Sequence, residues 1–127
     1  MTFFFDVNLS PKMVKAIRQV DCDAVHLRDH FPGETKDEDW LEFCAQKRWV
    51  GVTHDRNILS KPHLKQRLMQ VGVALLFLPK SKNAMNPREQ VIFFLEAWSA
   101  MEEAATAARP NKCLFQLQAN RKLTPIT

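Results

Sequence analysis

Short apolar runs alternate with helical segments along this chain, and the alternation limits the folds that it can adopt. The first run, Phe3–Phe5, stops at Asp6 and precedes Ser10-Pro11, which fits a helix N-cap with proline at the first helical position. The other expected strands are residues 24–27, 49–53 and 73–78, and the expected helices are 12–20, 35–47, 62 to about 72, and 87–108. This order predicts an α/β fold, a mainly parallel sheet with helices on both faces.

Local signals refine this expectation. Thr35-Lys36-Asp37-Glu38 has the pattern of a capping box, so Thr35 is predicted to be the N-cap of the second helix, with Trp40 on its buried stripe. Residues 73–78 (VALLFL) predict a central buried parallel strand. Residues 113–118 and 122–126 are expected to pair as a hairpin at an edge of the sheet. No repeat or domain boundary is visible, so residues 1–127 are expected to form a single domain.

The charge balance favours an anionic partner. The chain carries 18 Lys and Arg against 14 Asp and Glu, a net charge of +4. No acid occurs between residues 56 and 82, and we expect Arg56, Lys61 and Lys65 to hold the backbone of a nucleic acid. A solvated basic face is the alternative explanation of this stretch.

Cysteine usage and hydropathy bear on the compartment. The apolar runs are too short to cross a bilayer, and the N-terminus lacks the basic leader of a signal peptide. Cys22, Cys44 and Cys113 form no CxxC pair, which favours reduced thiols. We therefore expect a cytoplasmic protein without membrane contact.

Three aspartates stand where the expected strands and helices begin or end. Asp6 follows the first strand, Asp55 follows the third, and Asp37 lies in the first turn of the helix between them. Parallel strands deliver their carboxyl ends to one edge of a sheet, so these acids are expected to meet there. Clustered carboxylates repel one another unless a cation lies between them, and Mg²⁺ and Mn²⁺ prefer such oxygen ligands. We predict a metal site that activates water for phosphoryl displacement.

Each of these residues also has an ordinary structural explanation. Asp6 fits an Asx turn, Asp37 complements a helix dipole, and Asp55 fits a turn that faces solvent. Thr53 stands at the end of the third strand. In one interpretation its hydroxyl positions a water or the third carboxylate, and in the other it is only a β-forming residue that ends the strand. The combination of three acids at one edge favours the metal site.

Four segments in series resemble the PIN-like domain family. They are FFFDVNLSPKMVKAI, AVHLRDHF, KDEDWLEF and WVGVTHDRNI, and the resemblance covers roughly the first 80 residues. The family includes the VapC-like toxin ribonucleases of toxin–antitoxin pairs. The resemblance implies a three-layer α/β/α fold, RNA cleavage with Mg²⁺ or Mn²⁺ held by acidic residues, and an antitoxin protein as partner. The segment from Pro87 onward lies outside it.

The resemblance assigns roles by position. Asp6, Asp37 and Asp55 match the catalytic, metal-binding acids. Thr53 belongs to a Thr-x-Asp motif, and Asn8 matches a polar residue beside the first acid.

One position departs from the family pattern. Many members have a fourth acid shortly after the third, but Arg56 and Asn57 follow Asp55 here. That ligand is therefore absent or replaced by Asn57 or Asp39. Arg28, in the loop after the second strand, and Arg56 are the candidates for bidentate contacts with phosphate.

Other functions stay open from the sequence. A PIN-like fold without chemistry would serve as a module that binds nucleic acid or protein, and its nucleic-acid affinity would fall as salt rises. A receiver-type domain would use Asp55 as phosphoacceptor with Lys80 as phosphate partner. Such a domain requires two adjacent acids after the first strand, where this chain has only Asp6. The spacing of His26 and His30 suggests zinc, but no third ligand completes that site. Self-association as a homodimer through the C-terminal helix or hairpin is also open.

Overall fold

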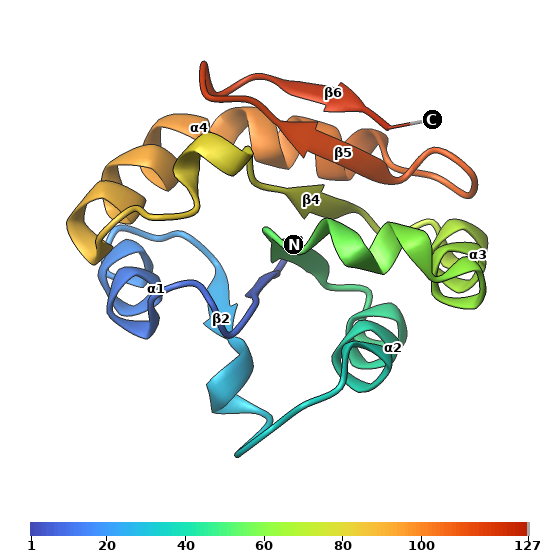
Figure 1. The fold of residues 1–127 in the computed structure, drawn as a ribbon. Coiled ribbons are helices and arrows are strands. Elements are labelled where there is room, and N and C mark those ends of the chain that lie inside the picture. The colour runs from blue at the N-terminus through green and yellow to red at the C-terminus, as the bar shows by residue number, and fades with distance from the viewer. Residues whose placement is uncertain (127) are drawn as a thin grey trace.

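The computed structural model describes residues 1–126, which form alternating strands and helices (Figure 1). The main elements are β1 (Phe3–Phe5), α1 (Pro11–Arg18), β2 (Ala24–His26), α2 (Asp37–Lys47), β3 (Val50–Thr53), α3 (Pro62–Val71), β4 (Leu75–Phe77), α4 (Pro87–Ala107), β5 (Leu114–Leu117) and β6 (Leu123–Pro125). Short 3₁₀ helices follow three strands, namely η1 (Leu27–Asp29), η2 (Arg56–Ser60) and η3 (Lys80–Lys82). The predicted α/β alternation is confirmed.

The strands form one six-stranded sheet in the order β2-β1-β3-β4-β5-β6. Neighbours from β2 to β5 are parallel, and β6 runs antiparallel to β5 as the second arm of the predicted edge hairpin. The chain passes from β1 outward to β2 and then returns across β1 to β3, so the direction of strand addition reverses between β1 and β3. In open α/β sheets, ligands bind at such a reversal, outside the carboxyl ends of the strands.

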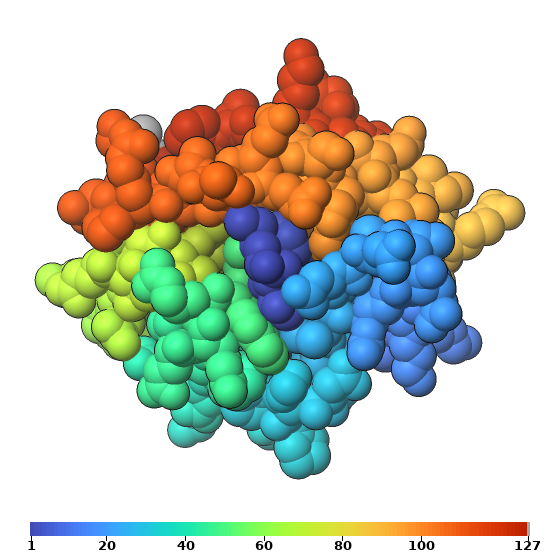
Figure 2. Space-filling model, turned by 180° about the vertical axis from the view of Figure 1, so that it is seen from behind, coloured from blue at the N-terminus to red at the C-terminus, as the bar shows by residue number. Residues whose placement is uncertain are grey.

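Helices cover both faces of the sheet and give three layers (Figure 1). α1 and α4 pack on one face with Phe3 and Phe5, whereas α2 and α3 pack on the other with Phe4. Successive side chains of a strand point to opposite faces, so the Phe3–Phe5 run supplies both cores, and all three rings are completely buried. Figure 2 shows the start of the chain enclosed between α4 (orange) and the green and lighter blue segments.

The first helix begins as the sequence predicts. Ser10 Oγ accepts hydrogen bonds from the backbone N–H groups of Lys12 (3.2 Å) and Met13 (3.3 Å), and Pro11 is the first helical residue. The Ser10 N–H donates to Gln90 Oε1 on α4 at 2.8 Å. This bond ties the loop after β1, which carries Asp6, to the longest helix.

The capping-box prediction for the second helix is wrong. α2 begins at Asp37 rather than after Thr35, and its N-cap Lys36 makes no side-chain capping hydrogen bond. Three acids in the first turn, Asp37, Glu38 and Asp39, instead place negative charge at the positive end of the helix dipole. The later start leaves Thr35 in the preceding loop.

The sequence also predicts reduced thiols and apolar runs that are too short to cross a bilayer. Cys22, Cys44 and Cys113 are buried free thiols, and burial raises the pKa of Cys113 to about 11. Among the helices within residues 1–126, none combines the length and the apolar character that a membrane span requires.

Candidate active site

A small polar pocket of about 80 Å³ lies at the carboxyl ends of β1 and β3, where the strand order reverses. All three predicted acids line it, together with Asn8 and Arg28, which the sequence also predicted as site residues. The lining residues are Asp6, Val7, Asn8, Leu27, Arg28, Thr35, Asp37, Trp40 and Asp55. The structure thus brings Asp6, Asp37, Asp55, Asn8 and Arg28 to one hollow, at the place where an α/β sheet of this order binds ligands.

The parallel register explains how Asp6 meets Thr53. Phe5 pairs with Val52, and the Asp6 N–H continues the ladder by donating to the Val52 carbonyl (3.0 Å). One residue further along, Asp6 and Thr53 are neighbours on the face that α2 and α3 cover. The Thr53 hydroxyl donates to Asp6 Oδ2 at 2.6 Å and accepts from the Asp55 N–H at 3.1 Å. A single buried hydroxyl therefore links the two strand ends that carry acids.

Asp6 is a buried carboxylate with neutral hydrogen-bond donors. Its residue is only 5% exposed, and Oδ1 accepts from the Val7 N–H at 2.5 Å. Burial raises the pKa of Asp6, while the hydrogen bonds from Thr53 and Val7 and the charge of His54 lower it, and the charge of Asp37 adds to the rise. No ion pair among residues 1–126 includes Asp6. This carboxylate thus holds a proton more tightly than an exposed aspartate does.

Trp40 holds Asp37 over the sheet. The indole Nε1–H donates to Asp37 Oδ1 at 3.1 Å, three residues earlier in the same helix. The ring stacks on Phe4 with centroids 5.9 Å apart and lies against Gly51, where a Cβ would be 3.3 Å from Trp40 Cζ3. Gly51 therefore leaves the space that the indole fills. The sequence placed Trp40 in the core only, although the Asp-x-x-Trp spacing in the first helical turn is a signal for this bond.

Asp37 and Asp55 each have local partners. Lys61 Nζ lies 3.6 Å from Asp37 Oδ2 and 3.9 Å from Glu38 Oε1. Asp55 Oδ1 accepts from the Asn57 N–H at 2.9 Å and so caps η2. Each acid thus combines the ordinary role that the sequence allowed with a place in the pocket.

The remaining predicted residues lie outside the pocket lining. Asp39 and Asn57 are exposed and do not line it, although both were candidates for the fourth ligand. Lys65 borders a different, open depression on α3. Arg56 points toward β5, where its Nη1 donates to Gln116 Oε1. Of the predicted cations, Arg28 therefore lines the pocket, Lys65 lies on the α3 surface, and Arg56 lies toward β5.

His26 makes two backbone contacts instead of a zinc site. Its Nδ1 accepts from the Arg28 N–H at 3.0 Å, so Nε2 carries the proton that it donates to the Leu9 carbonyl at 2.7 Å. These bonds connect the loop after β2 to the loop after β1. His26 thereby fixes the backbone on the Arg28 side of the pocket.

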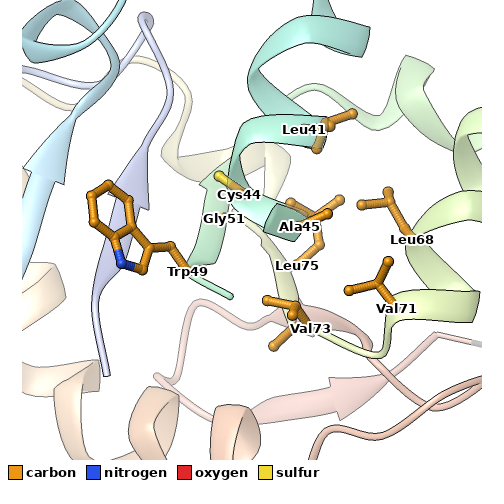
Figure 3. Close-up of a pocket in the computed structure, with 10 residues that line it drawn as sticks. Leu41, Cys44, Ala45, Trp49, Gly51, Leu68, Val71, Val73 and Leu75 are labelled. Carbon is orange, nitrogen blue, oxygen red and sulfur yellow. The ribbon is translucent and has the colours of Figure 1, made fainter. Parts of the chain in front are cut away.

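Two other hollows lack the acids of this pocket. Figure 3 shows one of about 10 Å³, where side chains of α2 and α3 meet over β3 and β4, and its lining is almost entirely apolar. That volume barely holds one water, so it is a packing void. A depression of about 670 Å³ beside the C-terminal hairpin contains no Asp or Glu among its lining residues.

The donors of the polar pocket suit a hard divalent cation in their chemistry. Carboxylate oxygens and an asparagine amide are the ligands that Mg²⁺ and Mn²⁺ prefer, and no ion pair within residues 1–126 engages the buried carboxylate of Asp6. In the arrangement described for residues 1–126, however, no three His, Cys, Asp or Glu side chains are grouped so that they hold one ion. The residues fit the ion in type, and their present spacing does not form a complete ligand set.

Comparison with known proteins gives one match. A family model described as a PIN-like domain matches residues 1–80, which run from β1 past β4 and include every residue of the polar pocket. Neither a curated protein nor a solved structure matches the chain. α4, β5 and β6 lie beyond the matched residues.

Proposed function

Because the chain belongs to the PIN-like domain family, we propose that it is a metal-dependent ribonuclease that cleaves RNA at the pocket of Asp6, Asp37 and Asp55. PIN-like domains are commonly nucleases that bind nucleic acid, and their active members use Mg²⁺ or Mn²⁺. One observation carries the proposal: the buried carboxylate of Asp6 shares a pocket with two other acids, and none of the ion pairs within residues 1–126 includes it. Such an arrangement binds cations and is costly without one.

Each residue of the site has a defined task in this proposal. Asp6, Asp37 and Asp55 hold the ion, which when bound activates a water and stabilises the oxygens of the phosphodiester. Thr53 orients Asp6 through its 2.6 Å hydrogen bond and fixes the Asp55 backbone. Asn8 adds an amide at the pocket rim. Asp39 and Asn57, which do not line the pocket, have no assigned task.

The cations around the pocket would hold the RNA backbone. Arg28 lines the pocket, and its Nη1 is already positioned by the backbone carbonyls of Phe31 and Gly33. Its other N–H groups are available for a phosphate. Arg56 lies on the other side of the three acids from Arg28. Lys61 and Lys65 extend the basic surface toward α3.

The cellular setting is part of the same proposal. In this proposal residues 1–127 form one domain that acts in the cytoplasm as a toxin, with an antitoxin partner that blocks the acidic pocket. A basic side chain of the antitoxin would suit the unpaired charge of Asp6. A homodimer through α4 or the hairpin is part of the same proposal, because α4, β5 and β6 contribute no residue to the lining of the pocket.

Cleavage of a labelled single-stranded RNA tests the proposal. The wild-type protein should cut it with Mn²⁺ or Mg²⁺, and EDTA or Asp6→Asn should abolish cutting while RNA binding is largely kept. Asp21→Asn is the matched control, because Asp21 is exposed and its positive φ of 67° is a conformation that asparagine tolerates. Equal cleavage by wild type and Asp6→Asn would overturn the assignment of the site.

The incomplete ligand set of residues 1–126 favours a second candidate, a PIN-like module that binds RNA without cutting it. In that case the wild-type protein binds RNA with a steep salt dependence and leaves it intact at any Mn²⁺ concentration. The receiver-type alternative requires a stable acyl phosphate on Asp55 after incubation with a small phosphodonor.

A further inference from the structure

Arg56 occupies a defined position at the carboxyl edge of the sheet. Thr53 pairs with Phe77, and Phe77 pairs with Gln116, so these residues form one row across β3, β4 and β5. The Arg56 guanidinium lies over the middle residue of this row, 5.7 Å from the centre of the Phe77 ring, and its Nη1 donates to Gln116 Oε1 at the end of the row. Arg56 is thus fixed at two points although it is exposed.

The amide of Gln116 can accept this bond in one orientation only. Its Nε2 donates to the carbonyl oxygens of Phe77 (3.0 Å) and Leu117 (2.9 Å). Two carbonyl acceptors require the NH₂ end of the amide at that place, so Oε1 faces Arg56. No sequence pattern indicates this contact, because sixty positions separate the two residues and Gln116 lies outside the family match.

The charge of Arg56 has no carboxylate partner within residues 1–126. The ion pairs there engage other cations, namely Arg67 with Glu42, Arg121 with Glu96, and Lys61 with Asp37 and Glu38. The contacts of Arg56 are an aromatic ring and a neutral amide oxygen. A guanidinium held in place with most of its N–H groups free is suited to a phosphate.

The surroundings extend the positive charge away from the acids. Lys80 and Lys82 of η3 follow β4, the strand that lies between β3 and β5. No acid occurs between Arg56 and Arg88, so this stretch of the chain carries basic charges alone. Two strand spacings separate β3 from β5, about 10 Å, which places Gln116 beyond the pocket but within reach of the same RNA strand.

We propose that Arg56, positioned by Gln116, forms a phosphate-binding subsite that holds single-stranded RNA on the β4–β5 side of the acidic pocket. This inference rests on the proposed function and deepens it. Strand β5, which lies outside the matched family region, then takes part in substrate binding, and Gln116 is a positioning residue that acts through Arg56. The RNA backbone runs along the carboxyl edge of the sheet, from the acids toward the hairpin.

Fluorescence anisotropy of a labelled single-stranded RNA tests the subsite separately from cleavage. The titration uses the full chain with Asp6→Asn and EDTA, so that the RNA stays intact. Arg56→Gln and Gln116→Met should each weaken binding about fivefold, and the double variant should bind no more weakly than Arg56→Gln alone. Arg56→Gln should also reduce the slope of log K against log salt by about 0.7, the value for one lost phosphate contact on a single strand.

Gln118→Met is the matched control, because Gln118 donates to Thr124 within the hairpin and does not contact Arg56. Its RNA affinity should stay unchanged. Arg56 is exposed, so Arg56→Gln tests the subsite even if Gln116→Met does not fold, and Gln116→Asn then tests the positioning role with a shorter amide.

The outcomes separate the two proposals. Unchanged affinity in Arg56→Gln overturns the subsite and leaves the ribonuclease proposal standing. Additive losses in the double variant overturn the positioning role of Gln116. Normal RNA binding by a wild-type protein that never cleaves overturns the ribonuclease and retains the subsite, whereas absence of any RNA binding overturns both.

Discussion

Replacement of Thr53 by valine is expected to weaken the protein in a pH-dependent way. The change keeps the shape of a completely buried side chain and removes one hydroxyl. The lost bond to Asp6 Oδ2 involves a charged group, and such bonds contribute about 1.5–3 kcal/mol. The Asp55 N–H also loses its acceptor, so we expect the free energy of unfolding at neutral pH to fall by about 2–3 kcal/mol. For a chain of this length the Tm should fall by roughly 8–12 °C.

The sign of the pH effect follows from Asp6. Burial raises the pKa of Asp6 in the folded state above its value in the unfolded chain. The folded state therefore holds this proton more tightly, and the resulting stability is present in acid and is lost as pH rises through the folded pKa. Thr53 stabilises the charged form, so Thr53→Val should raise that pKa further. The difference between wild type and variant should be largest at neutral pH and shrink as pH falls.

Urea unfolding from pH 8 down to pH 4 measures this difference. Thr53→Ser is the control, because it keeps the hydroxyl and should lose only about 1 kcal/mol for one methyl group, equally at all pH values. If Thr53→Val lowers the free energy of unfolding by less than about 0.5 kcal/mol, the Thr53 hydroxyl does not stabilise the fold through Asp6 and Asp55. A loss of the same size at every pH would show that the hydroxyl does not act on the ionised form of Asp6.

Three other substitutions test the support of the pocket. Trp40→Phe should lower the free energy of unfolding by about 1–2 kcal/mol and slow RNA cleavage, because Asp37 loses its indole donor; urea unfolding and cleavage rates measure the two effects. Gly51→Ala should cost about 1–3 kcal/mol in a thermal melt, since the added Cβ would lie 2.7 Å from Leu75 Cδ1. Lys61→Met should tighten Mn²⁺ binding in calorimetry, because the ammonium group 3.6 Å from Asp37 Oδ2 competes with the ion; unchanged affinity would contradict that competition.

The fold was largely predictable because its signals are local. Ser10-Pro11 starts a helix through its own backbone contacts, and short apolar runs between helices indicate buried parallel strands. The position of Asp6 at the end of β1 follows from the same pattern. The capping-box prediction failed because Thr35 precedes a helix that begins only at Asp37, where acidic residues satisfy the helix end.

The contacts that complete the site depend on register and tertiary packing. Thr53 meets Asp6 because β1 and β3 pair in one register, and no local pattern specifies that alignment. The bond from Arg56 to Gln116 joins η2 to β5, and no local pattern specifies that β5 lies next to β4 in the sheet. Sequence patterns identify which residues reach an edge, whereas the strand order decides which of them meet.

Anomalous diffraction from a crystal soaked in Mn²⁺ is the decisive measurement for the metal site. We expect a manganese peak in the polar pocket, in contact with a carboxylate oxygen of Asp6 and of at least one of Asp37 and Asp55. The peak should be absent from an Asp6→Asn crystal treated in the same way. A wild-type pocket without a peak at saturating Mn²⁺ would contradict the metal site and leave an RNA-binding module as the better description.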